Sequence, residues 1–588
     1  MENQVSRRIL GFFLAFIVMA VILVIRLVYL VQGSGLAQAG QAQSTQTLRV
    51  AANRGMIYDR KLRPLVNQQR LFRAAVMPVE QAVQAAVRQL PDRSASIVDL
   101  ARERKPFLLE FPTPYVYAKG INVFEVYKRY TDQPFAPHII GYTDGAGVHG
   151  VSGIERAYDD FLTHREAVIE VSYQADVTGS AVDGVSPTVN KSRYDVREGV
   201  VLTLDSDIQQ IIREACEEAI YHKNSEELAE DPAQRKAMEY GGALVMEVDT
   251  GNLLGYASYP EFSQNDVAGS LEAEGSPFIN RCFSAYNVGS PFKLTVAAAA
   301  LENGISRYHT YTCKGYEDIE GQIFYCNNLA GHGNINMSEA VQESCNTYFI
   351  HLMKLLGPDN VMRMVQSMGF GSGDTLAEGM TSVSGTLPEI SQLHMMPAEA
   401  ANLSFGQGKL LATPLQLAKM VALIANGGNS VTPRLVEGFT DETGTRIASY
   451  EPKYASNPVI SQRTAATLQE FMIGVVEEGS GIYAKPEAGG AGGKTGSAQT
   501  GIYVISDDES TEDEEIVHAW FTGFFPARSP KYAIVVFAEE GESGAKAAAP
   551  VFKLIADGLA ELEGIEPEKE EGKEYPVELG ENKEPPTN

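Results

Sequence analysis

An unbroken apolar stretch near the start of the chain sets the first constraint on its fold. Residues 9–25 are all apolar apart from one glycine, and beyond Arg26 the pattern continues to Val31. A span of this length can cross a bilayer. A single segment inside lipid must be a helix, because only a helix satisfies its own backbone hydrogen bonds there. The sequence therefore predicts a transmembrane helix at 9–31.

The charges around this span predict its orientation. Arg7 and Arg8 precede it, whereas residues 32–48 carry no charge. The positive-inside rule then places residues 1–8 in the cytoplasm and everything after residue 31 outside, as a single-pass protein of the cell membrane. A cleaved signal peptide is the alternative, because Ala37-Gln38-Ala39 resembles a cleavage site. The apolar region is longer than the usual run of about 7–15 residues, which favours an uncleaved anchor.

Composition excludes some function classes. A formal net charge of −27 argues against nucleic-acid binding through a phosphate-neutralising surface. Five cysteines without a C-x-x-C or H-E-x-x-H pattern predict neither a disulfide scaffold nor a metal site, and nothing indicates a cofactor. Cys313 and Cys326 flank a loop that would lie in an oxidising compartment, so a disulfide between them and two free thiols both remain open.

The stretch Asn287-Val288-Gly289-Ser290-Pro291-Phe292-Lys293 precedes a mostly apolar run to Leu301. Proline suits the first position of a helix, so the pattern predicts a buried helix with Ser290 at its N-terminus and Lys293 one turn later. Serine becomes a good nucleophile when a base takes its proton, and burial favours a neutral, basic lysine. Taken alone, S-x-x-K is also typical of a helix cap followed by a solvated lysine.

Two further motifs follow in the chain. Ser344-Cys345-Asn346 comes after a helix-like segment, and Lys494-Thr495-Gly496-Ser497 comes after a glycine run and opens a strand-like segment at 497–505. S-x-x-K, S-x-N and K-T-G in this order are the signature of serine penicillin-recognising enzymes. The chain thus resembles a class B penicillin-binding protein, which implies a D,D-transpeptidase that acts on peptidoglycan stem peptides and is inhibited by β-lactams.

The resemblance implies a role for each motif residue. Ser290 would attack the carbonyl between two D-alanines while Lys293 takes its proton. Ser344 would relay a proton to the leaving amine, Asn346 would hold the peptide amide, and Lys494 would supply positive charge.

The K-T-G strand would complete the site. Thr495 and Ser497 would hydrogen-bond the terminal carboxylate of the substrate, and Gly496 would let the strand approach it closely. The N–H groups of Ser290 and Ser497 would form an oxyanion hole.

The segment before the catalytic motifs carries two further family boxes, at 54–60 (RGMIYDR) and 153–159 (GIERAYD). The resemblance implies that they belong to a non-catalytic pedestal or dimerisation domain. A glycosyltransferase domain would need an E-D-x-x-F box before residue 200, and none is seen. The resemblance therefore implies a separate membrane partner, a SEDS-type glycosyltransferase.

Strands, then helices, then strands predict an α/β catalytic domain, a mixed sheet with an inserted helical subdomain, which is also the fold that the resemblance implies. Strand patterns occur at 241–258, 497–505, 516–525 and 532–537. The predicted organisation is a cytoplasmic tail (1–8), an anchor (9–31), a spacer (32–48), an α+β pedestal (49–199), a transpeptidase domain (200–562) and a disordered acidic tail (563–588).

Three other functions compete with this interpretation. A β-lactamase-like hydrolase needs a deacylating base, but the E-x-x-N pattern at Glu399–Asn402 falls far downstream of Asn346. A β-lactam-binding sensor would be expected to have several membrane spans, and only one is visible. A scaffolding component of the division or elongation machinery would not need the full motif set.

Overall fold

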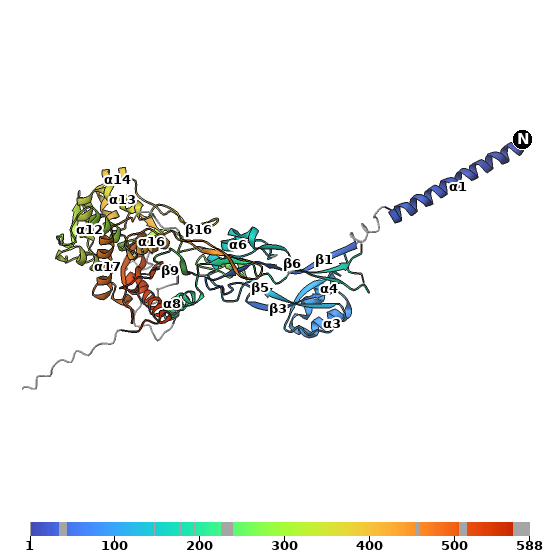
Figure 1. Cartoon of the computed structure of the whole chain (residues 1–588), viewed down its shortest axis with the longest axis horizontal. Coiled ribbons are helices and arrows are strands. Elements are labelled where there is room, and N and C mark those ends of the chain that lie inside the picture. Colours follow the sequence, from blue (N-terminus) through green and yellow to red (C-terminus); the bar gives the residue numbers. More distant parts are fainter. Residues whose placement is uncertain are drawn as a thin grey trace, which may run out of the picture.

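The computed structural model describes residues 2–33 and 44–567, apart from 146, 177, 183, 193, 225–238, 453–457, 505–513 and 542. Helix α1 (Glu2–Gly33) projects from one end of an elongated molecule, and the catalytic region lies at the other end (Figure 1). Most of the predicted spacer, residues 505–513 and most of the predicted acidic tail fall outside the described residues.

Helix α1 confirms the predicted helical span. Its segment Arg7–Tyr29 is long and apolar enough to cross a membrane, and none of it is buried against the rest of the described chain. Large apolar side chains such as Phe12 and Phe16 are therefore exposed along its length. In lipid, this surface is what a membrane-spanning helix presents.

The pedestal contains two three-stranded antiparallel sheets. The first has the order β1 (Thr45–Arg54), β6 (Thr163–Gln174) and β7 (Thr188–Ser192). The second has the order β4 (Phe107–Phe111), β3 (Gln69–Val76) and β5 (Ile121–Lys128), and helices α3 (Glu80–Gln89) and α4 (Ser94–Arg102) pack on it. This segment has the α+β composition that the sequence predicts.

The two pedestal boxes of the sequence meet in space. Arg54 ends β1, and Glu155 lies in α6 (Gly153–Ala157). Nε of Arg54 donates to Oε2 of Glu155 at 3.0 Å, and Nε of Arg129 donates to Oε1 at 2.7 Å. Arg54 and Glu155 are both buried. A buried carboxylate is tolerated when it is paired and hydrogen-bonded, and two guanidinium groups serve that purpose here.

One sheet crosses the predicted boundary between pedestal and catalytic domain. Its order is β2 (Met56–Tyr58), β8 (Gly199–Leu202), β19 (Val436–Thr440) and β20 (Arg446–Ser449). Strand β2, from the first pedestal box, pairs in parallel with β8, and β8 pairs antiparallel with β19. The expected division at residues 199–200 therefore runs through paired strands rather than through a linker.

The catalytic region is built on a five-stranded sheet of order β10 (Leu253–Tyr259), β9 (Gly241–Glu247), β23 (Tyr532–Ala538), β22 (Glu514–Phe525) and β21 (Gly492–Val504). The predicted α/β fold is confirmed. The sheet was expected to be mixed, but every neighbouring pair in it is antiparallel. Among the named strands that the structure describes, the parallel pair is β2 and β8. Strand β21 also starts earlier than predicted, so Lys494 lies inside it.

Helices cover both faces of this sheet. Val535 of β23 belongs to one apolar cluster, which includes α10 (Lys293–Glu302) and α16 (Pro414–Ala425), whereas Ile534 and Val536 belong to the other, which includes α8 (Ser206–Asn224) and α18 (Ala549–Glu563). This alternation is the period-two pattern of a strand buried on both sides. The helices between β10 and β21 in sequence form the inserted subdomain. Strand β21 lies at the edge of the sheet and contacts the last of these helices, α17 (Gln462–Glu477).

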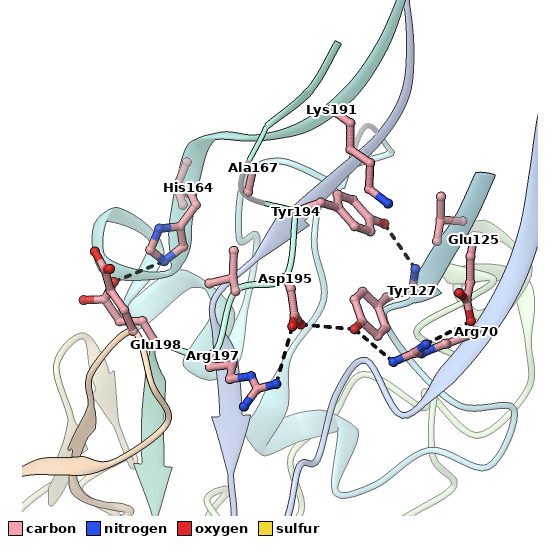
Figure 2. Close-up of a pocket in the computed structure, with 14 residues that line it drawn as sticks. Arg70, Glu125, Tyr127, His164, Ala167, Lys191, Tyr194, Asp195, Arg197 and Glu198 are labelled. Atoms are coloured by element: carbon pink, nitrogen blue, oxygen red, sulfur yellow. Dashed lines mark hydrogen bonds and ion pairs between the residues drawn. The ribbon is translucent and has the colours of Figure 1, made fainter. Parts of the chain in front are cut away.

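A separate pocket of about 890 Å³ is lined by pedestal residues and by Glu442 of the β19–β20 turn (Figure 2). The rings of Tyr127 and Tyr194 stack in it with centroids 5.8 Å apart, and the hydroxyl of Tyr127 lies 3.2 Å from the Asp195 carboxylate. None of the catalytic motif residues lines this pocket. It is therefore distinct from the candidate active site.

Candidate active site

The backbone before α10 presents Ser290 at a sharp turn. Ser290 begins a single 3₁₀ turn, Ser290–Phe292, that leads directly into the buried helix α10. Gly289 has φ of 68°, a left-handed conformation that glycine adopts without strain. The expected helix start is therefore present, with one tighter turn at its N-terminus.

A glycine turn distant in sequence supports this geometry. The N–H of Gly289 donates to the carbonyl of Gly406 at 2.8 Å. A Cβ on Gly406 would lie 2.0 Å from the carbonyl oxygen of Gly289, so no larger residue fits without moving the backbone. The sequence indicates only a turn at 405–408; its contact with the nucleophile's backbone is visible only in the fold.

Lys293 lies at the centre of the site. Its Nζ is 3.1 Å from Oγ of Ser290, 2.6 Å from the carbonyl oxygen of Ser344 and 2.7 Å from Oδ1 of Asn346. A neutral amine has two N–H donors and one lone pair. It can donate to the Ser344 carbonyl and to Asn346 while its lone pair accepts the hydroxyl proton of Ser290. The structure thus brings S-x-x-K and S-x-N together around one amine.

Burial favours the neutral form of this amine. The Lys293 side chain is fully buried. Burial lowers the pKa of Lys293 to about 8, against the opposing effect of the Cys345 and Cys326 thiols. An amine with this pKa is partly unprotonated near neutral pH, as a general base must be.

Ser344 completes a hydroxyl contact with the nucleophile. It adopts φ of 56° between α11 (Met337–Gln342) and α12 (Asn346–Leu356), which turns the chain back toward α10. Its Oγ donates to Oγ of Ser290 at 2.9 Å. Nδ2 of Asn346 donates to the carbonyl of Tyr325 at 3.1 Å, which fixes the amide so that Oδ1 faces Lys293.

Strand β21 forms the opposite wall. Lys494 is fully buried and its Nζ lies 3.2 Å from the carbonyl oxygen of Thr495. Burial, with a further contribution from Lys293, lowers the pKa of Lys494 well below its usual range. A substrate carboxylate placed beside Lys494 would counter both effects, because an opposite charge stabilises the ammonium.

Two further contacts hold the K-T-G segment. Oγ1 of Thr495 lies 3.0 Å from Oγ of Ser480, a residue that follows α17 (Gln462–Glu477) and that sequence reasoning missed. Ser497 is exposed, and its Oγ accepts from the N–H of Gly544 at 3.2 Å. The hydroxyl groups expected to bind a carboxylate are therefore positioned by neighbouring segments.

Trp520 and the cysteines lie outside the catalytic motifs described above, apart from Cys345 within S-x-N. Trp520 in β22 is fully buried, and its Nε1 donates to the carbonyl of Asn287 at 2.9 Å. All five cysteines are free thiols, so of the two alternatives for Cys313 and Cys326 the structure has the unbonded one.

Comparisons with known proteins agree with this geometry. The family model of the penicillin binding protein transpeptidase domain matches residues 241–557, more than half of the chain. Stage V sporulation protein D of Bacillus subtilis is 30% identical over 470 residues, which span 77% of this chain and 66% of that protein. Peptidoglycan D,D-transpeptidase MrdA of Acinetobacter baumannii is 26% identical over 564 residues, which span 85% of this chain and 80% of that protein.

A solved structure shares the fold. A chain from a peptidoglycan synthase complex that coordinates polymerization and crosslinking superposes with a TM-score of 0.65 at 24% identity, covering 95% of this chain and 99% of that chain. The match to the family model, the three motifs gathered at one site and the shared fold lead to one conclusion. The chain belongs to the penicillin-binding protein transpeptidase family, as a class B member.

Proposed function

We propose that this chain cross-links peptidoglycan stem peptides through an acyl-enzyme on Ser290. One observation carries the proposal: Oγ of Ser290 lies 3.1 Å from the amine of the fully buried Lys293. A hydroxyl and a base within hydrogen-bond distance form an activated nucleophile. No metal or cofactor takes part in the proposed reaction.

The first half of the reaction forms the ester. Lys293 accepts the Ser290 proton as Oγ bonds to the carbonyl carbon between the two D-alanines. The N–H groups of Ser290 and Ser497 stabilise the resulting oxyanion. The C–N bond then breaks, Ser344 relays a proton from Lys293 to the leaving nitrogen, and D-alanine departs.

The second half transfers the acyl group. An amine of another stem peptide attacks the ester carbon and gives up a proton through the same relay, and the C–Oγ bond breaks to restore the Ser290 hydroxyl. Asn346 holds the peptide amide during both halves. Lys494, Thr495 and Ser497 bind the donor's terminal carboxylate, and Gly496 lets the strand approach the substrate.

Labelling with a β-lactam tests the nucleophile. We expect a labelled β-lactam to acylate the purified chain on a peptide containing Ser290, and Ser290→Ala to abolish the label. Ser404→Ala is the matched control, because Ser404 is also buried and its hydroxyl bonds only the carbonyl of Ala401 among the described residues. A label on any other residue contradicts the assignment.

The lifetime of the label separates the transpeptidase from a hydrolase. A β-lactamase releases its acyl group rapidly, whereas a transpeptidase lacks a base that activates water for this ester. After transfer to buffer without β-lactam, we expect the Ser290 adduct to persist much longer than one catalytic turnover. Rapid release with product hydrolysis would favour the hydrolase.

We further propose that α1 anchors the chain with residues 1–8 in the cytoplasm and that a SEDS-type membrane glycosyltransferase supplies the glycan strands. Gly11, Ala15 and Ala20 support a helix contact in lipid, because small side chains let helices approach closely. The related chain from a synthase complex also supports a partner of this kind.

Reconstitution with lipid-linked disaccharide-pentapeptide tests the partner. The purified chain alone should make no glycan polymer, and cross-linked product should form only with a co-expressed polymerase. Polymer made by this chain alone would require a glycosyltransferase site within it.

A further inference from the structure

Four metal-ligating side chains converge next to the S-x-N motif. Cys313 ends β12 (Tyr311–Cys313), Cys326 follows β14 (Gln322–Tyr325), His332 precedes β15 (Gly333–Ile335) and Cys345 precedes α12. Their three sulfurs and one ring nitrogen all lie within 4.8 Å of one another. Nothing in the proposed reaction uses them.

The spacing of these atoms fits a tetrahedral ion. With Zn–S of about 2.3 Å and Zn–N of about 2.0–2.1 Å, neighbouring ligand atoms lie about 3.5–3.8 Å apart. Sγ of Cys326 lies 3.7 Å from Sγ of Cys345 and 3.5 Å from Nδ1 of His332. Both distances therefore match two edges of a zinc tetrahedron.

The surroundings are closed and rigid. The three cysteines are nearly fully buried, with exposed fractions of 2%, 3% and 0% for Cys313, Cys326 and Cys345. Cys313 pairs opposite Gly333 in the β12–β15 ladder, which brings the first and third ligands together. Oγ1 of Thr347 lies 3.4 Å from Sγ of Cys345, where a hydroxyl can support a bound thiolate.

The loop backbones are also tightly packed. Gly331 has φ of 82°, and a Cβ there would lie 2.5 Å from the carbonyl oxygen of Cys313. The N–H of Cys326 donates to the carbonyl of Gly315 at 2.9 Å. These contacts hold the segments that carry Cys313, Cys326 and His332 against one another.

We propose that Cys313, Cys326, His332 and Cys345 bind a structural zinc ion. Three thiolates and one imidazole in a closed set of four are a ligand combination that zinc favours, and they leave no open position for catalysis. The sequence shows the pattern C-x12-C-x5-H-x12-C, without the short C-x-x-C spacing on which metal motifs are usually recognised. That is why no metal site is expected from sequence.

The ion would act on the active site through Cys345. Cys345 lies between Ser344 and Asn346, which both contact the amine of Lys293. A bond from its sulfur to zinc ties this segment to the β12–β15 loops. Cys345 is thus a positioning residue, and metal binding fixes the two side chains that surround the base.

Metal content is the first test, and it does not depend on enzymatic activity. The full chain, purified in detergent without chelator, should carry about one zinc per chain by elemental analysis. Cys313→Ser should lose it. Cys216→Ser is the matched control, because Cys216 is fully buried in α8 and lies outside the cluster.

Cobalt substitution keeps the test independent of the folding of any variant. Wild-type protein exchanged into Co²⁺ should show intense visible bands of a tetrahedral site with sulfur-to-metal charge transfer. Wild-type protein without zinc and without these bands overturns the proposal. So does a preparation two daltons lighter in which a disulfide links Cys326 to Cys345.

The positioning role has its own readout. We expect removal of the ion by a chelator to slow β-lactam acylation about tenfold. This is the lower end of the roughly 10–100-fold loss that follows when residues supporting a metal site are mutated. The comparison is made at a temperature where circular dichroism shows the chelated protein folded, and added Zn²⁺ should restore the rate. Full-rate acylation by folded, metal-free protein would overturn the positioning role.

Discussion

Gly496 and Pro291 pack so closely that a Cβ on the glycine would lie 2.6 Å from Cδ of the proline. The contact presses edge strand β21 against the turn that carries Ser290. On the other side of the strand, a Cβ on Gly544 would lie 2.4 Å from the carbonyl oxygen of Gly496. The K-T-G strand is therefore clamped between the nucleophile's turn and the segment before α18.

Gly496→Ala tests this clamp. Adding a methyl group to a packed interior typically costs about 1–3 kcal/mol, and here the strain separates β21 from Ser290. We expect acylation by a β-lactam to slow at least tenfold, measured by stopped-flow or gel labelling. Gly145→Ala is the control, since its Cβ would meet nothing within 4 Å. Equal rates for both variants would show that the clamp does not matter.

Acylation should depend on pH through Lys293. Burial lowers the pKa of this amine to about 8, and only its neutral form can accept the Ser290 proton. The rate constant should therefore rise from pH 6, pass half of its maximum near pH 8 and level off above about pH 9. The measurement is the second-order acylation rate across this range. A rate that falls with rising pH would assign the proton acceptor to another group.

The buried Arg54–Glu155 pair should matter for stability rather than chemistry. Removing one member of a buried ion pair costs about 3–5 kcal/mol when the remaining charge is left unpaired. Arg129 still pairs with Glu155 after Arg54 is removed, so the cost here should fall below that range. We expect Arg54→Ala to lower the melting temperature while the folded protein still acylates.

Arg49→Ala provides the control on the same strand. Arg49 lies 3.5 Å from Glu170, and its side chain is 52% exposed, so its pair should contribute little. A similar melting temperature for both variants would mean that Glu155 does not need Arg54.

Fusions test the orientation of α1. Arg7 and Arg8 before the span predict that residues after 31 lie outside. A reporter that is active only outside the cytoplasm should work when fused after residue 48. The reciprocal reporter, active only in the cytoplasm, should be silent at the same position. The opposite result would reverse the topology.

Local patterns in the sequence predicted much of this structure. Three short motifs were enough to predict one site, because a serine nucleophile such as Ser290 needs a nearby base such as Lys293. In the structure, Lys293 contacts Ser290 and also Ser344 and Asn346. Helix and strand periodicity predicted α10 and the strands of the catalytic sheet. These signals are local, so a single sequence contains them.

Contacts between distant segments could not be predicted in this way. Examples are the contacts of Gly406 with Gly289, Ser480 with Thr495 and Cys326 with Cys345. In each pair, the sequence around one residue does not identify the other as its partner. The same holds for strand β2, whose pairing with β8 joins the two predicted domains. For the Gly406–Gly289 contact, the sequence offered one signal: the glycines in 405–408 indicate a turn whose backbone conformation favours glycine.

The pairing of β2 with β8 makes the junction between the pedestal and the catalytic region stiff rather than flexible. Swinging the catalytic region relative to the pedestal at this point would break backbone hydrogen bonds, so the joint resists bending. The distance between Ser290 and the far end of the pedestal is then set by the fold, so the active site is held at a fixed height above the base of the pedestal. Lengthening the pedestal strands would raise that height.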